Sequence, residues 1–318
     1  MTEPLDAVEE ADRPRTAAHS PVRVRVPAKI NLHLGVGPLR ADGYHEVTTV
    51  YQAISLYDEV TARPGDTLVL TMEGEGAGDL PLDDSNLVVR AVRALARYTG
   101  RPPHARLHLR KQIPVAGGLA GGSADAAAAL VACDTLWGTH IARDELAELA
   151  AELGSDVPFL VLGGTALGTG RGERISPVLA TGHAWHWVVA VADGGLATPD
   201  VYRELDRMRS SGVVELANAD TDRLLAALRQ RDPDELGQVL CNDLQPAAVA
   251  LRPSLADTLK AGHHEGALAS LVSGSGPTCL FLAEDARHAA ELADRIGERG
   301  GCRQVRVAHG PVPGARVM

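Results

Sequence analysis

A glycine-rich loop is the segment whose residues point most directly to chemistry. Residues 114–123 read PVAGGLAGGS and lead into an alanine-rich run, for which Ser123 is the expected N-cap. The glycines leave backbone N–H groups accessible, and a helix N-terminus carries partial positive charge, so such a loop binds anions and above all phosphate. The alternative is a flexible connector between a strand and a helix. Four glycines with almost no polar filler favour phosphate binding, to which Lys111 could add a charge.

Two shorter segments carry weaker signals. The sequence SGSGPT (273–278) is a second glycine turn between apolar runs, a pattern that ordinary hairpins also show. The sequence GSDVP (154–158) places Asp156 at the start of a short helix with Pro158 just inside it. Locally, a capping carboxylate and a catalytic carboxylate fit this position equally well.

Several common nucleotide and metal motifs are absent from the sequence. The three lysines follow Ala28, Arg110 and Leu259, so no Gly-Lys-Ser/Thr element of a P-loop exists. No GxGxxG segment indicates a dinucleotide fold, and no HRD or DFG segment indicates a protein kinase. The twelve histidines show no convincing metal-ligand spacing.

Composition narrows the classes of partner. The 318 residues are 45% hydrophobic and 23% charged, enough for two domains with a substantial core, and the net charge is −10. Such a surface repels nucleic acid, and no stretch approaches the ~18 apolar residues of a membrane span. Four distant cysteines indicate a reducing compartment. We therefore expect a soluble cytoplasmic protein with a disordered acidic leader over residues 1–20.

The elements that must position these segments alternate loosely between strands and helices. The first half predicts strands at 22–26, 27–36, 47–63, 67–72 and 105–110, with helices over 83–100, from Ser123 to Gly138, and over 143–153. The second half predicts strands at 187–192 and 304–308, a strand–turn–strand over 268–285, and helices at 222–231, 233–237 and 286–299. Because no βαβ unit repeats, an α+β fold is favoured over a doubly wound sheet.

Three segments together resemble a known family. PAKINLHL (27–34), PVAGGLAGGSADAA (114–127) and SGSGPTCLF (273–281) look like the signature segments of the GHMP kinase superfamily, in order and at fitting distances. The resemblance covers roughly residues 22–310. It implies a two-domain α+β fold with the active site in the cleft between the domains. The implied boundaries are 21–178 for an N-terminal ATP-binding and catalytic domain, and 179–318 for a C-terminal GHMP kinase domain.

The same resemblance implies an ATP-dependent phosphotransferase with an alcohol acceptor. Lys29 and Asp156 occupy the catalytic positions: Asp156 would accept the proton of the hydroxyl, and Lys29 would pair with it and steady the transferring phosphoryl group. A Mg²⁺ ion would bridge phosphate oxygens, with Ser123 as a candidate ligand. The positions implied for ATP are Asn86 and Lys111 at the adenosine and, around the phosphates, Pro114, Val115, Ala116, Gly117, Gly118, Leu119, Ala120, Gly121, Gly122, Ser123 and Ala124.

Three further stretches narrow the resemblance within the superfamily: RADGYHEV (40–47), GSDVPF (154–159) and TPDVYREL (198–205). They imply that the acceptor is the 2-hydroxyl of 4-diphosphocytidyl-2-C-methyl-D-erythritol, in the non-mevalonate (MEP) route to isoprenoid precursors. Tyr44 and His45 match the pair that recognises cytidine. The full set of implied substrate positions is Asn31, Tyr44, His45, Asp156, Thr198, Tyr202, Gly274, Ser275 and Gly276.

The loop departs from the family pattern at two positions. Relatives read closer to GLGGGSSDA, whereas Ala120 stands here for a glycine and Ala124 for a serine. Alanine adopts only part of glycine's torsional range, so the loop is expected to be stiffer or differently shaped. Two other readings stay open: another small-molecule kinase of the superfamily, acting on homoserine, mevalonate or a sugar, and an ATP-binding regulator that has lost catalysis.

Overall fold

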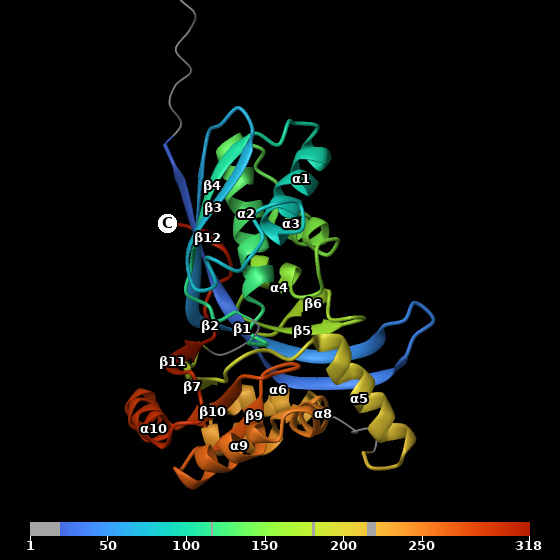
Figure 1. Ribbon diagram of the computed structural model, residues 1–318, viewed down its shortest axis with the longest axis vertical. Helices are drawn as coiled ribbons and strands as arrows, with labels where there is room; N and C mark the ends of the chain where they lie inside the picture. The colour runs from blue at the N-terminus through green and yellow to red at the C-terminus, as the bar shows by residue number, and fades with distance from the viewer. Residues whose placement is uncertain (1–19, 116, 180–181, 215–220) are drawn as a thin grey trace, which may run out of the picture.

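The computed structural model describes residues 20–115, 117–179, 182–214 and 221–318 (Figure 1). The predicted disordered leader, apart from Ser20, lies outside the described residues, and so does Ala116 of the glycine loop.

A long antiparallel hairpin forms the centre of the first sheet. Strands β1 (Val22–Leu39) and β2 (His45–Arg63) pair along most of their length, with register shifts that bend them. β2 also pairs with β4 (Ala105–Lys111), whose buried and exposed residues alternate, and β4 pairs in parallel with β3 (Leu68–Gly74). Four short strands complete this sheet: β5 (Thr165–Thr169), β6 (Arg174–Pro177), β8 (Cys241–Asn242) and β12 (Arg316–Val317).

Helices cover one face of this sheet, as Figure 1 shows for α1, α2 and α3. Their bounds are α1 (Leu87–Thr99), α2 (Gly121–Trp137), α3 (Arg143–Ala150) and α4 (Val157–Leu162). α2 contacts β1, β2, α1 and α4, and its small alanine side chains, buried along most of the helix, permit this close approach from several sides. The glycine loop leads directly into α2. The packing of α2 on these four elements therefore fixes where the loop ends.

A second sheet lies in the other part of the molecule. Among the described residues it has the antiparallel order β11 (Gln304–Gly310), β7 (Trp185–Val191), β10 (Cys279–Ala283), β9 (Ala269–Val272). The helices of this part are α5 (Thr198–Ser210), α6 (Thr221–Gln230), α7 (Pro233–Val239), α8 (Gln245–Leu251), α9 (Ser254–His264) and α10 (Ala286–Arg299). A second apolar cluster lies around this sheet.

The architecture confirms the predicted α+β class with two parts. The second sheet starts at Trp185, near the predicted boundary after Val178, but β8 and β12 return to pair with β1 of the first sheet. The division at 178/179 therefore stays a prediction. Within the described residues, no helix is both long and apolar enough to cross a membrane.

Several predicted boundaries were wrong for local reasons. The two strands expected at 22–26 and 27–36 are one strand, β1, because Pro27 is accommodated where the register shifts. The first helix begins after Asn86, whose Oδ1 accepts from the Val88 N–H, and α3 ends at Ala150, not Leu153. Helices α5, α8 and α9 were not predicted.

Candidate active site

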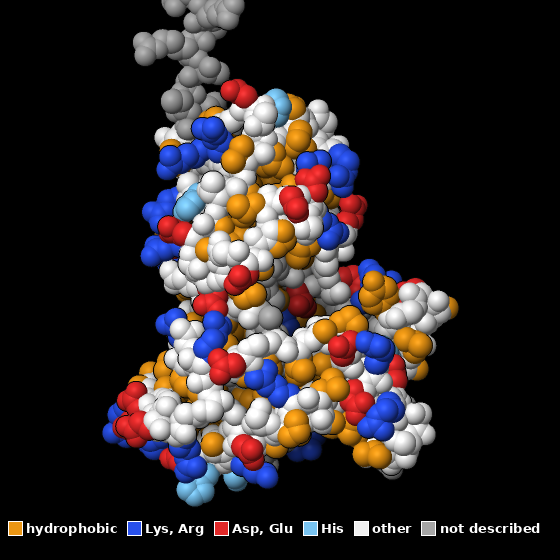
Figure 2. Space-filling model, in the orientation of Figure 1, with side chains coloured by type: hydrophobic (Ala, Val, Ile, Leu, Met, Phe, Trp, Pro, Cys, Tyr) orange, Lys and Arg blue, Asp and Glu red, His pale blue; other side chains and the backbone are white. Residues whose placement is uncertain are grey.

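The strongest candidate site is a cavity of about 400 Å³ between the two parts of the molecule. In the view of Figure 2 the surface is notched between these parts. The cavity is lined from β1, β2, the glycine loop and the start of α2, the residues before α4, α5, and the turn between β9 and β10. All three segments that carry the family resemblance therefore contribute to one cavity.

The two glycine motifs contact each other directly. Gly118 has φ 72°, and a Cβ at this position would collide with the backbone oxygen of Ser273, so only glycine fits. The Ser273 hydroxyl donates to the Gly118 oxygen at 3.1 Å, and the Lys29 N–H donates to the Leu119 oxygen at 3.2 Å. The loop is thereby held between β1 and the turn 273–278.

The start of α2 differs from the prediction. Ala120, with φ 57° and ψ 35°, is the N-cap residue and makes no side-chain capping bond, whereas Ser123 lies inside the helix. The prediction that Ser123 caps α2 was wrong, because a left-handed residue at 120 starts the helix three residues earlier. Gly121, Gly122 and Ser123 line the cavity, so the N-terminal turn of a 17-residue helix faces it.

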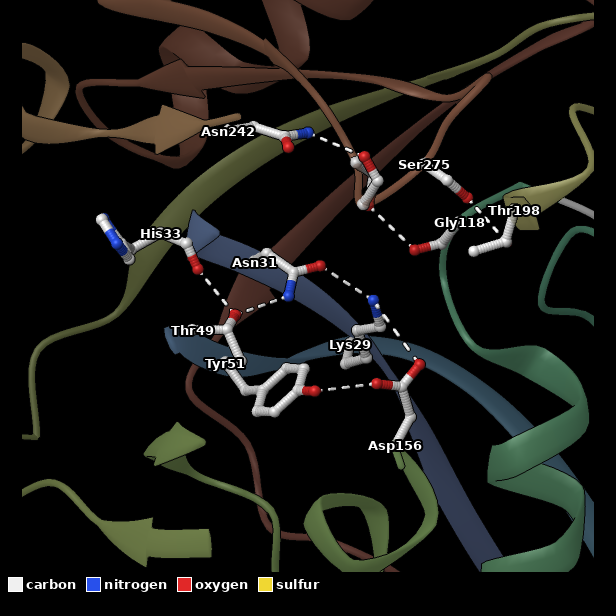
Figure 3. Close-up of polar contacts among 12 residues, drawn as sticks. Lys29, Asn31, His33, Thr49, Tyr51, Gly118, Asp156, Thr198, Asn242 and Ser275 are labelled. Carbon is white, nitrogen blue, oxygen red and sulfur yellow. Dashed lines mark hydrogen bonds and ion pairs between the residues drawn. The ribbon is translucent and has the colours of Figure 1, made fainter. Parts of the chain in front are cut away.

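Lys29 and Asn31 project into the cavity from alternate positions of β1 (Figure 3). The Lys29 Nζ donates to the Asn31 Oδ1 at 2.8 Å. The Asn31 Nδ2 donates to the Thr49 hydroxyl at 2.8 Å, which in turn donates to the His33 backbone oxygen at 2.6 Å. This chain of donors orients the Asn31 amide, so its oxygen holds the ammonium group in place.

Asp156 is the N-cap residue of α4, but its side chain makes no capping hydrogen bond. Its Oδ2 lies 3.7 Å from the Lys29 Nζ, and its Oδ1 accepts from the Tyr51 hydroxyl at 3.0 Å. The side chain is 29% exposed and lines the cavity. The structure thus rules out the capping alternative for this carboxylate and presents it to a ligand.

Tyr51 was not among the predicted site residues. Its ring stacks on Phe159 with 4.9 Å between centroids, and burial together with the Asp156 carboxylate raises the pKa of Tyr51 well above its usual value. The hydroxyl therefore stays a hydrogen-bond donor. A tyrosine in an apolar strand looks like any core residue, so no sequence signal distinguished it.

A second cavity of about 500 Å³ opens beside the first and shares with it Val47, Ser155, Arg171, Thr198 and Tyr202. His45 stacks on Tyr202 with ring centroids 5.1 Å apart, and its Nε2 lies 2.9 Å from the Asp206 Oδ1. Burial, with the Asp156 charge, raises the pKa of Tyr202 to about 12. Tyr44 is 56% exposed and lines this side cavity.

The turn 273–278 lines the main cavity next to Thr198, which lines both cavities. The Thr198 hydroxyl lies 2.9 Å from that of Ser275, and the Asn242 Nδ2 donates to the Gly274 oxygen at 2.8 Å. A Cβ at Gly274 would lie 3.5 Å from the Lys29 Nζ, which places this turn next to Lys29. Gly274, Ser275 and Gly276 all line the main cavity, and their contact with a substrate stays a prediction.

Two residues assigned to ATP lie elsewhere. The Asn86 side chain already has partners within the protein. Its Oδ1 caps α1, and its Nδ2 donates to the Pro81 oxygen at 2.6 Å. Lys111 is buried, and its Nζ lies 2.8 Å from an Asp58 oxygen and 2.6 Å from an Asp125 oxygen. Although burial alone would lower it, these carboxylates raise the pKa of Lys111. Its ammonium group anchors β4 to α2, so a direct contact with ATP is not supported.

Part of the predicted loop serves as a frame for the site. Pro114, Val115, Leu119 and Ala124 do not line the main cavity, and the last two are buried almost completely. The residues of the loop that do line it are Gly117, Gly118, Ala120, Gly121, Gly122 and Ser123. Leu119 and Ala124 therefore pack in the core, while the neighbouring glycines face the cavity.

Arg171 and Ser155 also line both cavities, although sequence reasoning did not select them. Arg171 stands between two glycines in GTGRGE, which could have been noted as a turn that presents an arginine. Ser155 precedes the predicted catalytic carboxylate and carried no signal of its own.

The fold and the site define a class of small-molecule kinases. Family models described as the GHMP kinase N-terminal domain and the GHMP kinase C-terminal domain match residues 86–164 and 224–302. GHMP kinases use ATP. A crystal structure of a homoserine kinase from Cytophaga hutchinsonii shares the fold, with a TM-score of 0.74 at 19% identity over 95% of this chain and 99% of the other.

Closer relatives narrow this class. The 4-diphosphocytidyl-2-C-methyl-D-erythritol kinase of Salinispora tropica is 71% identical over 97% of this chain and 98% of its own length. A crystal structure of a 4-(cytidine 5'-diphospho)-2C-methyl-D-erythritol kinase is 32% identical, with a TM-score of 0.73 over 90% of this chain and 98% of the other. The chain belongs to the family of 4-diphosphocytidyl-2-C-methyl-D-erythritol kinases, within the GHMP kinases.

Proposed function

We propose that this chain transfers the γ-phosphoryl group of ATP to the 2-hydroxyl of 4-diphosphocytidyl-2-C-methyl-D-erythritol, in the non-mevalonate pathway to isoprenoid precursors. The observation that carries this proposal is the position of Asp156. Its carboxylate lies beside Lys29, in a cavity whose lining includes both the start of α2 and residues of the aromatic side cavity. A phosphate donor and a nucleoside-bearing acceptor would therefore meet at this carboxylate.

The catalytic roles follow from this geometry. The hydroxyl oxygen of the acceptor attacks the γ-phosphorus of ATP, and ADP leaves. Asp156 accepts the proton of that hydroxyl during the attack. Lys29 is the cation next to that carboxylate and is oriented by Asn31, so it stabilises charge on the transferring phosphoryl group. Tyr51 holds the second carboxylate oxygen and leaves Oδ2 toward Lys29.

ATP is assigned to the glycine loop. The first turn of α2 offers unpaired N–H groups and the positive end of the helix to the phosphates. Mg²⁺ takes hard oxygen ligands, and the Ser123 hydroxyl and Asp156 carboxylate both line this cavity, so the donor set suits it. Among the described residues no cluster of three or more His, Cys, Asp or Glu could hold a metal ion. Bound through these oxygens and the phosphates, Mg²⁺ would neutralise phosphate charge.

The cytidine of the acceptor is assigned to the side cavity. Tyr44 offers an exposed aromatic face on which a pyrimidine can stack, and His45 is fixed by Asp206 and Tyr202 so that its ring can contact the base edge. Thr198 and the turn 274–276 then bound the path from this cavity to the catalytic carboxylate. We place the reaction in the cytoplasm, because all four cysteines are free, as expected of a reducing compartment.

The acceptor and the base can be tested in one assay. ADP release from ATP is measured with 4-diphosphocytidyl-2-C-methyl-D-erythritol, homoserine, mevalonate and galactose as separate acceptors; only the first should support turnover. Asp156→Asn keeps the shape but removes the base, so kcat should fall by about 10²-fold or more while ATP still binds. Turnover with homoserine, mevalonate or galactose alone would refute the proposed acceptor. The absence of turnover with all four compounds would favour a regulator that has lost catalysis. Unchanged kcat in Asp156→Asn would remove this residue from the mechanism.

A further inference from the structure

Arg171 occupies the junction between the main cavity and the side cavity. It is one of the few residues that line both. Its guanidinium carbon lies 4.9 Å from the centroid of the Tyr44 ring, a cation–π geometry. The positive charge thus stands between the place assigned to the cytosine and the catalytic carboxylate.

The turn that carries Arg171 is rigidly built. Gly170 and Gly172 have φ angles of 77° and 102°, and the Arg171 N–H donates to the Glu173 Oε2 at 2.6 Å. A Cβ at Gly172 would lie 2.5 Å from the Tyr51 hydroxyl, so the turn packs against the residue that holds Asp156. Side chains at either glycine would be strained, which fixes where the arginine is presented.

The guanidinium group of Arg171 has no acidic partner in the described part of the chain. No Asp or Glu oxygen lies within 4.0 Å of it, although the side chain is half-buried. The other arginine of the side cavity, Arg203, is paired with Asp200. A half-buried guanidinium group without a carboxylate partner can bind an anion of a ligand.

We propose that Arg171 binds the diphosphate that links the nucleoside of the acceptor to its alcohol. The planar fork of an arginine pairs with phosphate oxygens through two parallel hydrogen bonds, which a neutral linker could not form. The guanidinium also covers one side of the Tyr44 ring. The same arginine therefore contacts the residue proposed to stack on the cytosine. This inference rests on the proposed function and adds a specificity residue to it.

Binding of acceptor fragments tests this role without turnover. CDP and cytidine are titrated calorimetrically into the wild-type protein, Arg171→Ala and Arg171→Lys, each saturated with a non-hydrolysable ATP analogue so that the ATP site is filled. The Kd for CDP should rise about ten-fold or more in Arg171→Ala, as expected for a lost charge-assisted pair, and less in Arg171→Lys. The Kd for cytidine should change by no more than about two-fold. KM for the acceptor should rise in parallel, with KM for ATP unchanged.

Arg174→Ala is the matched control, because this exposed arginine lies three residues away on β6 and lines neither cavity. It should bind CDP like the wild type. If Arg171→Ala, folded by circular dichroism, keeps the wild-type preference for CDP over cytidine, the inference is wrong even though the proposed function stands. If the wild-type protein neither binds CDP nor phosphorylates the acceptor, the proposed function itself fails, and this inference with it.

Discussion

At the scale of single residues, the site depends on how one carboxylate is held. Asp156 has a neighbour on each oxygen: the Tyr51 hydroxyl at 3.0 Å and the Lys29 ammonium at 3.7 Å. A carboxylate held at one oxygen alone could rotate about its Cβ–Cγ bond. The buried tyrosine therefore acts as a positioning residue for the proposed base, which would have to meet a hydroxyl at about 3 Å.

Tyr51→Phe should lower kcat by about ten-fold, because it removes one charge-assisted hydrogen bond and keeps the ring stacked on Phe159. KM for ATP should change little. Since burial and Asp156 raise the pKa of Tyr51 well above its usual value, the factor should be the same at pH 7 and pH 9. Steady-state assays at both pH values, with Tyr57→Phe on the same strand as control, check this. A wild-type kcat in Tyr51→Phe would show that Lys29 alone suffices.

At the scale of elements, the glycine loop carries an avoidable strain. Ala120 adopts a left-handed conformation at the start of α2, which is unfavourable for any residue with a Cβ. The sequence predicted a stiffer or differently shaped loop from this alanine. The structure shows that a left-handed residue is accommodated here, while Gly118 takes the position where backbone contact allows no Cβ.

Ala120→Gly should therefore raise the free energy of unfolding by about 1 kcal/mol, since glycine adopts φ 57° without strain. Ala124→Gly, four residues on and buried inside the same helix, should lower it by about 1 kcal/mol. Urea denaturation of both variants measures the two values. The opposite signs are the test: a loss of stability in both would mean that residue 120 does not adopt the left-handed conformation in solution.

At the scale of the whole molecule, the buried His33 and the partly buried His186 should link stability to pH. His33 lies on β1 near the return strand β8, and its side chain is buried without a partner for Nε2 in the described structure. Burial lowers the pKa of His33, against a smaller opposing effect of Asp243. Burial, with neighbouring histidines, also lowers the pKa of His186. The folded protein therefore binds fewer protons than the unfolded chain near pH 6.

Because these folded-state pKa values lie below the usual value of about 6.5, stability is retained above that pH and is lost as pH falls below it. The melting temperature should decrease between pH 7.5 and pH 5.5. His33→Gln should reduce this decrease, whereas the exposed His104→Gln should leave it unchanged. Calorimetric scans across this range provide the measurement. An identical pH dependence in His33→Gln would assign the effect to other groups.

Sequence reasoning reached much of this site because its signals are local. The glycine loop was selected from its own residues, and Lys29, Asn31 and the catalytic reading of Asp156 came from the family resemblance of their segments; all of them line one cavity. Lys111 does not line that cavity, and its contact with ATP stays a prediction. It lies three residues before the loop, but whether a lysine faces a ligand or two buried carboxylates depends on Asp58, far away in sequence.

The sequence by itself determined the types of local structure and chemistry near the site: where glycine must bend the chain, that a helix follows the glycine loop, and which residues can carry charge to a phosphate. These properties depend on residues within a few positions of each other. Only the tertiary structure decided which of them meet. The contact of Gly118 with Ser273, the hold of Tyr51 on Asp156 and the exposure of Arg171 to both cavities all join segments that are distant in sequence. Such contacts depend on strand register and on the packing of two sheets, which local residue patterns do not encode.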